Sequence, residues 1–546
     1  MLPTRYTKAM IDDYSKKGYW KDITYSALYE KNAKEYADKE ALVDEDKRLT
    51  WREANDAVNR IAAALVDLGF QKDDVLVCHL PNIVELILFR VACEKAGVIN
   101  ISAVRTLRGA EIDYALKLTK AKGYVSFQTF RGFDHWDMIQ HMRPELPSME
   151  HVFICGDEVP EGAHSVAEIL GRPLSPEQTA SYAFDERTLK YWEVAWVEFT
   201  SGSTGLPKVI ECPLALRTFA AQSHMARLGM TGSDTIGAFA PVSGAGRPGY
   251  FFPPFVGARS VLMEHFDAGK ALQLIEKERV TIAAVVPTQL IMMLESPDFE
   301  NYDLSSLRVL NTTGAPLPFQ VAEQAEERFG CRIVNHYGGI DAGSITSCNA
   351  EDPVEVRRFA VGKVHTGNEV KLLGDDGQEV ATGEIGEVWF RGAGSVGGYW
   401  RDPVLTEEAW GSGWFCMGDL AKRDDLGNIM IVGRRKNVII RGGQNIYPTE
   451  IENILQMHPR VASVALVPMP DPVMGEKACA VVVLKGDERL ELADLVAFLR
   501  ERGVAAFKFP ERVMLRESMP LVSDAKLDRN ALVEDLLREI KAEASA

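Results

Sequence analysis

Short apolar runs alternate with amphipathic segments over most of the chain. Buried strands are predicted at residues 74–80 (DVLVCHL), 279–286 (RVTIAAVV), 307–310 (LRVL) and 331–334. Helices are predicted at about 83–96, in the segment ALQLIEKE before residue 279, and at 318–329. Regular alternation of strands and helices is typical of a mainly parallel sheet, so we expect an α/β fold.

The pattern changes near residue 360. From there to about residue 432 the chain is rich in Gly and Asp, with short alternating strands such as 386–391 (GEVWFR) and 428–432 (NIMIV). This texture predicts an antiparallel, barrel-like subdomain. The last block mixes strands and helices and has the size of a small α+β domain. We therefore predict an N-terminal domain at 1–435, with the barrel-like subdomain at about 360–432, and a mobile C-terminal domain at 436–546.

The composition is that of a folded protein with an acidic surface. Of 546 residues, 46% are hydrophobic and 25% are charged, which excludes disordered and fibrous classes. The 61 Lys and Arg residues against 78 Asp and Glu residues give a net charge of −17. Such a surface repels a phosphate backbone, so nucleic acid is not expected as a partner. A phosphate-bearing small molecule would need a local site of backbone amides and a few lysines.

The cysteines and the apolar segments indicate a reducing, aqueous compartment. The eight cysteines have no C-x-x-C spacing and lie mostly in apolar runs, so we expect reduced, partly buried thiols. The N-terminal residues lack the apolar core of a signal peptide. The most apolar stretch, 282–294, is too short to span a bilayer. A cytoplasmic protein without a membrane span is therefore predicted.

One segment has the chemistry of a phosphate-binding loop. Residues 199–208 read FTSGSTGLPK and follow an apolar-leaning strand. Glycines let backbone amides surround an anion, hydroxyls add donors, and Lys208 supplies a positive charge. The ending differs from the Walker pattern, because Lys208 follows a proline and precedes a valine. The G-x-G-x-x-G match at 392–397 leads into Gly398 and Pro403 instead of a helix, so it is interpreted as an ordinary loop.

Six segments occur in the order of a known superfamily. They are FTSGSTGLPK (199–208), TTGAPLP (312–318), NHYGGID (335–341), WFCMGDL (414–420), GRRKNVIIRGGQNIYPTEIE (433–452) and PLVSDAKLDR (520–529). With them the whole chain resembles the adenylate-forming superfamily of acyl- and aryl-CoA synthetases, luciferases and peptide-synthetase adenylation domains. Segments 14–20 (YSKKGYW), 80–85 (LPNIVE) and 503–513 (GVAAFKFPERV) resemble the aryl-acid–AMP ligase branch, which includes 2,3-dihydroxybenzoate–AMP ligase.

The resemblance implies a two-step ligase that uses ATP, Mg²⁺ and a thiol. A carboxylic acid attacks the α-phosphate of ATP to give an acyl-adenylate and pyrophosphate, and a thiol then displaces AMP. Because both partners in the first step are anions, charge neutralisation by Mg²⁺ and lysines matters more than a nucleophilic side chain.

The resemblance also implies roles for particular residues. The catalytic lysines are Lys208 and Lys526. The ATP and AMP site comprises Thr200, Ser201, Gly202, Ser203, Thr204, Gly205, Lys208, Gly314, Ala315, Pro316, Tyr337, Gly338, Asp419 and Arg434. Asp419 is expected to accept both ribose hydroxyls, and Asp341 and Thr204 to bind the metal. Lys436 matches the hinge around which the C-terminal domain turns, and Gly442 and Gly443 would flank the thiol arm. The expected acid pocket contains Ser243, Gly244, Ala245, Gly246, Tyr250, Gly339 and Ile340.

Three departures from the family pattern affect these expectations. Asp341 stands where the family usually has glutamate, and Ala525 precedes Lys526 where a glycine is usual. An ungapped alignment places Gly244, Ala245 and Gly246 where hydroxybenzoate-activating relatives have His-Asn-Tyr. Loss of those side chains removes hydrogen-bond discrimination and leaves volume. The sequence therefore predicts a bulkier or less hydroxylated acid than salicylate: aryl, alicyclic or medium-chain.

The identity of the thiol stays open between two partners. Residues 442–448 (GGQNIYP) are similar to the corresponding segment of CoA ligases, which favours coenzyme A. The alternative is a stand-alone aryl-acid adenylating enzyme that loads the phosphopantetheine of a separate carrier protein. A non-catalytic nucleotide-binding homologue is a third hypothesis, which retention of Lys208, Asp419 and Lys526 disfavours. Relatives often form homodimers, and the sequence leaves that question open.

Overall fold

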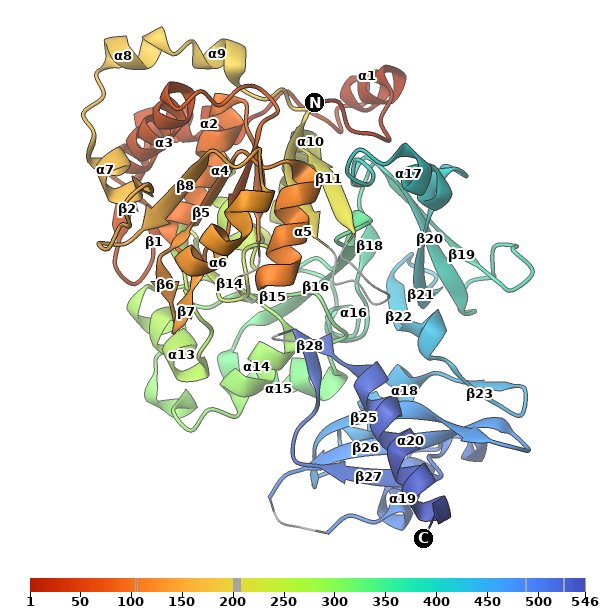
Figure 1. Ribbon diagram of the computed structural model, residues 1–546. Coiled ribbons are helices and arrows are strands. Elements are labelled where there is room, and N and C mark those ends of the chain that lie inside the picture. The colour runs from red at the N-terminus through yellow and green to blue at the C-terminus, as the bar shows by residue number, and fades with distance from the viewer. Residues whose placement is uncertain (104, 106, 200–207, 487–488, 524–525, 546) are drawn as a thin grey trace.

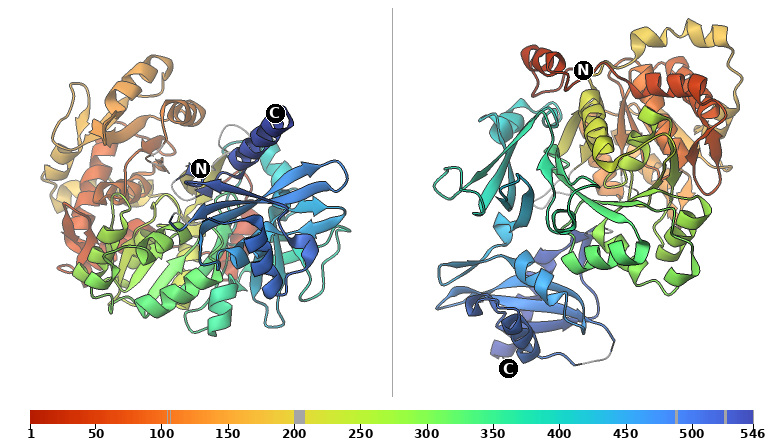
Figure 2. Two further views of the ribbon diagram at one scale, coloured as in Figure 1. Left: turned by 90° about the horizontal axis from the view of Figure 1, so that it is seen from below. Right: turned by 180° about the vertical axis from the view of Figure 1, so that it is seen from behind.

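The computed structural model describes residues 1–546 except 104, 106, 200–207, 487–488, 524–525 and 546. A large body contains two α/β sheets, with a smaller antiparallel sheet beside them and a separate domain at the C-terminus (Figure 1). The right-hand view of Figure 2 shows from behind that the C-terminal domain projects from one end of the body. The predicted α/β class is confirmed.

The first sheet of the body has nine strands in the order β18-β17-β16-β15-β14-β12-β13-β1-β2. Its strands from β1 to β16 pair in parallel, and β2, β17 and β18 are antiparallel additions at the edges. The bounds are β1 (Glu40–Val43), β2 (Arg48–Thr50), β12 (Thr235–Ala238), β13 (Arg259–Leu262), β14 (Ile282–Val285), β15 (Val309–Thr312), β16 (Arg332–Gly339), β17 (Gly343–Ser347) and β18 (Lys363–Val364). The predicted strands at 279–286, 307–310 and 331–334 are β14, β15 and the first half of β16.

The second sheet has seven strands in the order β11-β10-β4-β3-β5-β8-β9, and all its pairs are parallel except β10 with β11. The bounds are β3 (Val75–Cys78), β4 (Ile99–Ser102), β5 (Gly123–Phe127), β8 (His151–Cys155), β9 (His164–Ser165), β10 (Val194–Phe199) and β11 (Val209–Pro213). A short hairpin, β6 (Thr129–Phe130) and β7 (Phe133–Asp134), lies outside both sheets. The strand predicted at 74–80 is β3, which is buried along its whole length because helices cover a parallel sheet on both faces.

Helices connect and cover these strands (Figure 1). Their bounds are α1 (Lys8–Lys16), α2 (Tyr25–Glu35), α3 (Trp51–Asp67), α4 (Val84–Ala96), α5 (Gly109–Thr119), α6 (His135–Met142), α7 (Val166–Gly171), α8 (Pro176–Ser181), α9 (Phe184–Arg187), α10 (Leu214–Leu228), α11 (Pro248–Phe251), α12 (Pro253–Val256), α13 (Ala268–Lys277), α14 (Pro287–Leu294), α15 (Phe319–Phe329), α16 (Val354–Phe359) and α17 (Pro403–Trp410). The helices predicted at 83–96, in ALQLIEKE and at 318–329 are α4, α13 and α15.

Helix α4 lies in the interior and is buried at every position. Its charged residues have polar partners there, as a buried charge requires. Lys47 pairs with Glu85 at 2.7 Å, and Glu94 accepts hydrogen bonds from the backbone and the hydroxyl of Ser26, both at 2.8 Å. Burial raises the pKa of Glu94 to about 7 in spite of those hydrogen bonds.

The antiparallel pairing predicted for residues 360–432 is confirmed. The strands β19 (Asn368–Leu373), β20 (Gly386–Gly392), β21 (Phe415–Arg423) and β22 (Ile429–Arg434) follow one another in chain order. Among the described residues β22 does not pair with β19, so this is an open sheet and not a closed barrel. Four short strands are too few to curl into a closed barrel with a packed interior.

The C-terminal domain has a sheet in the order β24-β23-β26-β25 with β27 beside β26. Its elements are β23 (Ile439–Arg441), β24 (Gln444–Ile446), α18 (Pro448–Leu455), β25 (Val461–Asp471), β26 (Gly475–Leu484), α19 (Leu492–Glu501), β27 (Arg512–Arg516), β28 (Leu521–Ser523), β29 (Lys526–Leu527) and α20 (Arg529–Ser545). Two hydrophobic clusters consist wholly of residues between 439 and 540. The domain therefore has its own core, which is compatible with a boundary at 435, although the boundary itself stays a prediction.

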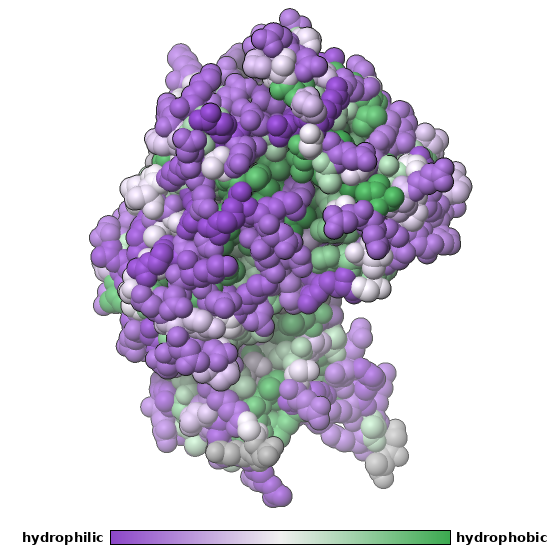
Figure 3. Space-filling view, turned by 90° about the vertical axis from the view of Figure 1, so that its left-hand side faces the viewer, coloured by the Kyte–Doolittle hydropathy of each residue, from purple (hydrophilic) through white to green (hydrophobic). Residues whose placement is uncertain are grey.

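The surface and the thiols agree with the composition. Figure 3 shows a mostly hydrophilic face with apolar side chains in small groups. In the described part of the chain, no helix has the length and apolar character to cross a membrane. Seven of the eight cysteines are buried, Cys416 is half-buried, and each is a free thiol.

Candidate functional site

A buried carboxylate lies where the nine-stranded and four-stranded sheets meet. Asp419 on β21 stands opposite Arg434 on β22 in the strand register, and Arg434 Nε lies 2.6 Å from Asp419 Oδ1. From the other sheet, Tyr337 on β16 donates its hydroxyl to Asp419 Oδ2 at 2.6 Å. Asp419 is 4% exposed. Burial of Tyr337, and then the negative charge of Asp419, raise the pKa of Tyr337 well above its usual value. Three of the predicted nucleotide residues are thus in direct contact.

Lys208 lies at the base of a hairpin. Strands β10 and β11 are antiparallel and pair from Val194 with Pro213 to Phe199 with Val209. Lys208 directly precedes Val209, so it lies at this end of the pair. The Lys208 ammonium lies 3.2 Å from the Tyr399 hydroxyl and 4.8 Å from the centre of its ring. Tyr399 was not predicted, and the contact arises because the 392–399 loop packs across β11.

Lys208 and Asp341 line the same cavity. This cavity has a volume of about 520 Å³ and is lined by Lys208, Asp341, Trp389, Tyr399, Glu407, Glu408, Ala409, Gly411, Ser412, Phe415 and Cys416. The described residues contain no cluster of three or more His, Cys, Asp or Glu side chains that could hold a metal alone. A single carboxylate suits Mg²⁺, which typically binds one or two protein carboxylates plus phosphates and water. The cavity therefore offers a carboxylate of the kind that Mg²⁺ binds together with phosphates and water.

Several predicted residues fall outside the described part of the chain. These are Thr200, Ser201, Gly202, Ser203, Thr204 and Gly205 of the phosphate loop. The backbone of Lys526 is described as the first residue of β29, which pairs with β28. Its predicted catalytic role remains a prediction.

Other predicted nucleotide and thiol residues lie in exposed turns. Gly314, Ala315 and Pro316 form the exposed segment that follows β15, with Gly314 at a φ of 91°. Gly442 and Gly443 form the two-residue turn between β23 and β24, and both have positive φ (55° and 80°). A two-residue hairpin turn with positive φ at both positions favours glycine, which accounts for this pair. Lys436 lies exposed in the short 3-10 helix Arg435–Asn437, directly after β22.

The expected acid-pocket residues come from two neighbouring segments. Residues 242–247 form a turn after β12 that leads into Tyr250 on α11, and Gly339 and Ile340 lie at the tip of the β16–β17 hairpin. A side chain at Gly246 would collide with the carbonyl oxygen of Ala240, whereas one at Gly244 would only touch the Pro241 carbonyl at 3.6 Å. Gly246 is therefore needed for close backbone packing, whereas the backbone around Gly244 would accommodate a side chain.

A cluster of buried arginines lies beneath this turn. Glu198 on β10 contacts Arg217 of α10 at 2.5 Å and Arg247 of the turn at 2.7 Å, and Arg90 of α4 donates to the hydroxyl of Tyr250. The sequence analysis missed these residues. A signal was present, because Glu198 interrupts the otherwise apolar strand VAWVEF.

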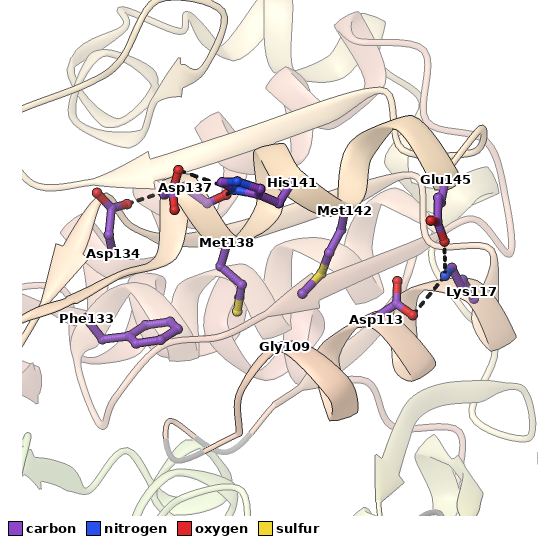
Figure 4. Close-up of a pocket in the computed structure, with 10 residues that line it drawn as sticks. All are labelled: Gly109, Asp113, Lys117, Phe133, Asp134, Asp137, Met138, His141, Met142 and Glu145. Atoms are coloured by element: carbon purple, nitrogen blue, oxygen red, sulfur yellow. Dashed lines mark hydrogen bonds and ion pairs between the residues drawn. The ribbon is translucent and has the colours of Figure 1, made fainter.

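A second cavity, larger than the one at Lys208 and Asp341, lies elsewhere. Its volume is about 740 Å³, and it lies between α5 and α6 (Figure 4). Its charged residues pair with one another, as in the contacts of Lys117 with Asp113 (2.9 Å) and Glu145 (2.6 Å). None of the ten residues drawn is a predicted site residue, so size alone does not identify the site.

The glycines at 392–397 have a structural explanation. The segment forms turns and extended chain, as predicted, instead of opening a helix. A side chain at Gly394 would lie 2.5 Å from the carbonyl oxygen of Ser344, and one at Gly343 would collide with the carbonyl of Gly394. The glycines let two backbones pack closely and do not form a nucleotide-binding turn.

The chain matches known proteins over nearly its whole length. Residues 29–400 match the AMP-binding enzyme family, and residues 450–526 match the AMP-binding enzyme C-terminal domain. A 2,3-dihydroxybenzoate-AMP ligase of Bacillus subtilis is 29% identical over 99% of this chain and 98% of its own length. A medium-chain fatty-acid–CoA ligase of Escherichia coli is 29% identical over 96% of this chain and 93% of its own length. The crystal structure of the anthranilate CoA ligase AuaEII with anthranoyl-AMP superimposes with a TM-score of 0.85 at 26% identity, covering 96% of this chain and 98% of that one.

Proposed function

Because the chain belongs to the AMP-binding enzyme family, we propose that it is an AMP-forming carboxylic acid:CoA ligase. In the first step an oxygen of the acid's carboxylate bonds to the α-phosphorus of ATP. The bond from that phosphorus to the bridging oxygen breaks, and pyrophosphate leaves. In the second step the sulfur of coenzyme A attacks the acyl carbon of the acyl-adenylate, loses its proton to solvent, and releases AMP.

The observation that carries the proposal is the environment of Asp419. A buried carboxylate held between Tyr337 and Arg434 is fixed in position, and it can accept hydrogen bonds from two neighbouring hydroxyls. The ribose of ATP presents two such hydroxyls. Hydrogen bonds to a charged acceptor are the strong ones, so this carboxylate suits recognition of a ribose.

The cavity shared by Lys208 and Asp341 supports binding of the phosphates nearby. The Lys208 ammonium lies over the ring of Tyr399, and both residues line the cavity that Asp341 also lines. We assign the phosphate loop 200–205 and Lys208 to the β- and γ-phosphates, and Asp341 and Thr204 to Mg²⁺. When bound, the metal supplies positive charge for the leaving pyrophosphate. The protein's part is to hold that charge and the nucleotide in one orientation.

The C-terminal domain contains Lys526, the second lysine to which we assign a catalytic role. We assign to Lys526 the task of bridging the acid's carboxylate and the α-phosphate, where it offsets the charge of two anions. Its domain has its own core and follows an exposed 3-10 helix containing Lys436, so rotation about that residue would leave this core intact. Such a rotation would exchange Lys526 for the Gly442-Gly443 turn, beside which the thiol arm would enter.

The thiol and the acid are the finer parts of the proposal. Coenzyme A is favoured by the segment GGQNIYP and by the CoA ligases among the similar proteins. The second candidate, adenylation of an aryl acid for a carrier protein, is supported by the similarity to the 2,3-dihydroxybenzoate-AMP ligase. For the acid we propose an aryl, alicyclic or medium-chain carboxylate. The proposed cytoplasmic location and a homodimer are separate hypotheses that the described residues do not bear on.

A pyrophosphate-release screen over carboxylic acids, with and without coenzyme A, tests the function. We expect acid-dependent release with ATP alone and formation of an acyl-CoA when coenzyme A is added. Acid-dependent release without acyl-CoA formation would favour the carrier-protein alternative. Lys526→Ala should abolish acid-dependent pyrophosphate exchange, whereas the control Lys485→Ala, at an exposed position of the same domain, should not. Unchanged exchange in Lys526→Ala would refute its assignment.

A further inference from the structure

Four charged side chains meet in the interior under the proposed acid pocket. Arg217 Nη2 and Arg247 Nη2 contact the two different oxygens of Glu198, at 2.5 and 2.7 Å. Arg90 lies against the rings of Trp196 and Tyr250, 5.3 and 5.0 Å from their centres. These residues come from four separate elements, so only the folded chain brings them together.

The cluster has more positive than negative charge. Three guanidinium groups share one carboxylate, which leaves an excess of two positive charges in an interior of low polarity. Burial lowers the pKa of Arg90 to about 9, so the group still carries its charge at pH 7. Burial also lowers the pKa of Arg247, and arginine stays protonated at neutral pH. An uncompensated buried charge is costly, and a further anion would offset that cost.

The cluster also has hydrogen-bond donors for which the described residues offer no acceptor. Within the described part of the chain, Nε and Nη2 of Arg90 and Nε of both Arg217 and Arg247 are buried without a partner. Buried guanidinium donors are normally satisfied, since leaving them unpaired costs free energy. Arg90 is 2% exposed, so bulk water does not replace the missing partners.

The cluster is continuous with the residues assigned to the acid. Arg247 Nη2 donates to the carbonyl oxygen of Ser243 at 2.9 Å, and Arg90 donates to the hydroxyl of Tyr250. Glu198 comes one residue before the end of β10, which leads to the phosphate loop. Burial, and then the charge of Arg247, lower the pKa of His336 to about 4, so the histidine next to Tyr337 is neutral and adds no further positive charge to the cluster.

We propose that the acid substrate carries a second anionic group and that this group binds the arginine cluster through Arg247. The inference rests on the proposed function and names its substrate class: a dicarboxylic acid or an acid with an equivalent second anion. One carboxylate reacts with ATP, and the other offsets the excess charge of the cluster. Arg247 is the residue through which the group is reached, because its side chain is 17% exposed and lies in the turn that borders the pocket.

Matched acids test this in the full-length protein. Acid-dependent pyrophosphate exchange is measured for three pairs: benzoate with benzene-1,4-dicarboxylate, cyclohexanecarboxylate with cyclohexane-1,4-dicarboxylate, and hexanoate with hexanedioate. A hydrogen bond between charged groups is worth about 1.5–3 kcal/mol, so the diacid of the fitting pair should be preferred about 10- to 100-fold in kcat/KM. If monoacids react as well as diacids in every pair, the inference is overturned and the proposed function stands. If no acid supports exchange, the proposed function is overturned and the inference with it.

Substitutions of Arg247 test whether this residue causes the preference for the diacid. Arg247→Met should bring the ratio of kcat/KM for the diacid to that for the monoacid close to one, and Arg247→Lys should keep part of the preference. The control Arg279→Met removes an exposed arginine that pairs with Asp303, and should leave the preference unchanged. Should Arg247→Met fail to fold, thermal unfolding of the unmodified protein gives the same answer. The preferred diacid should raise its midpoint more than the monoacid does, and an equal effect of both overturns the inference.

Discussion

Replacing Asp419 tests the nucleotide site most directly. In Asp419→Ala the two proposed hydrogen bonds to the ribose are lost, each worth about 1.5–3 kcal/mol because the acceptor is charged. Together they amount to about 3–6 kcal/mol, or a rise of about 100- to 10,000-fold in the KM for ATP. Asp419→Asn keeps the shape and loses the charge, so we expect a smaller rise of about tenfold.

The contacts of Asp419 show how to separate binding from folding. Arg434 is 51% exposed in its ion pair, so that pair adds at most about 1 kcal/mol to the free energy of unfolding. Tyr337→Phe removes the hydroxyl that donates to Asp419 and leaves the carboxylate in place. It therefore serves as the matched control, with a change in the KM for ATP of only a few fold.

The assay is acid-dependent pyrophosphate exchange at saturating acid with ATP varied, accompanied by thermal unfolding of each variant. The KM for ATP should rise in the order wild type, Tyr337→Phe, Asp419→Asn and Asp419→Ala. A folded Asp419→Ala protein whose KM for ATP stays within about threefold of wild type would refute the assignment of the ribose to this carboxylate.

Two further predictions concern stability. Because the pKa of Glu94 is raised to about 7 in the folded protein, its contribution to stability is present below pH 4.5 and is lost as the pH rises to about 7. In Glu94→Gln the free energy of unfolding, measured with urea from pH 5 to pH 8, should decline less steeply with pH. A decline as steep as in the wild type would show that another group causes it. Gly246→Ala should destabilise the fold by about 1–3 kcal/mol or more through collision with Ala240, whereas Gly244→Ala should fold normally and only raise the KM for the acid. Equal unfolding midpoints for the two glycine variants would contradict the packing argument.

The local pattern of the chain was sufficient for the class of fold. The strands β3, β14 and β15 and the helices α4 and α15 lie within a few residues of where apolar periodicity predicted them. Periodicity failed for β16, which was expected to end at residue 334 and continues to Gly339. Its second half is held by antiparallel pairing with β17, and no local signal encodes a partner strand.

The order of motifs predicted the nucleotide residues, and the structure shows the contacts among three of them. The sequence named Tyr337, Asp419 and Arg434 but not their mutual contacts, which depend on two sheets meeting. The glycines at 392–397 show the opposite case. Their spacing matched a nucleotide motif, whereas the fold uses them for close backbone packing.

The sequence by itself therefore determined the α/β class and the family pattern, and it predicted the site residues, since these depend on local periodicity and on short motifs. Only the tertiary structure decided that Glu198 and the three arginines Arg90, Arg217 and Arg247 share one buried volume. Each of them is an ordinary charged residue in its own segment, and the excess of positive charge exists only after four distant segments are packed together. Long-range packing sets the local dielectric and the local charge, on which the proposed preference for a second anionic group rests.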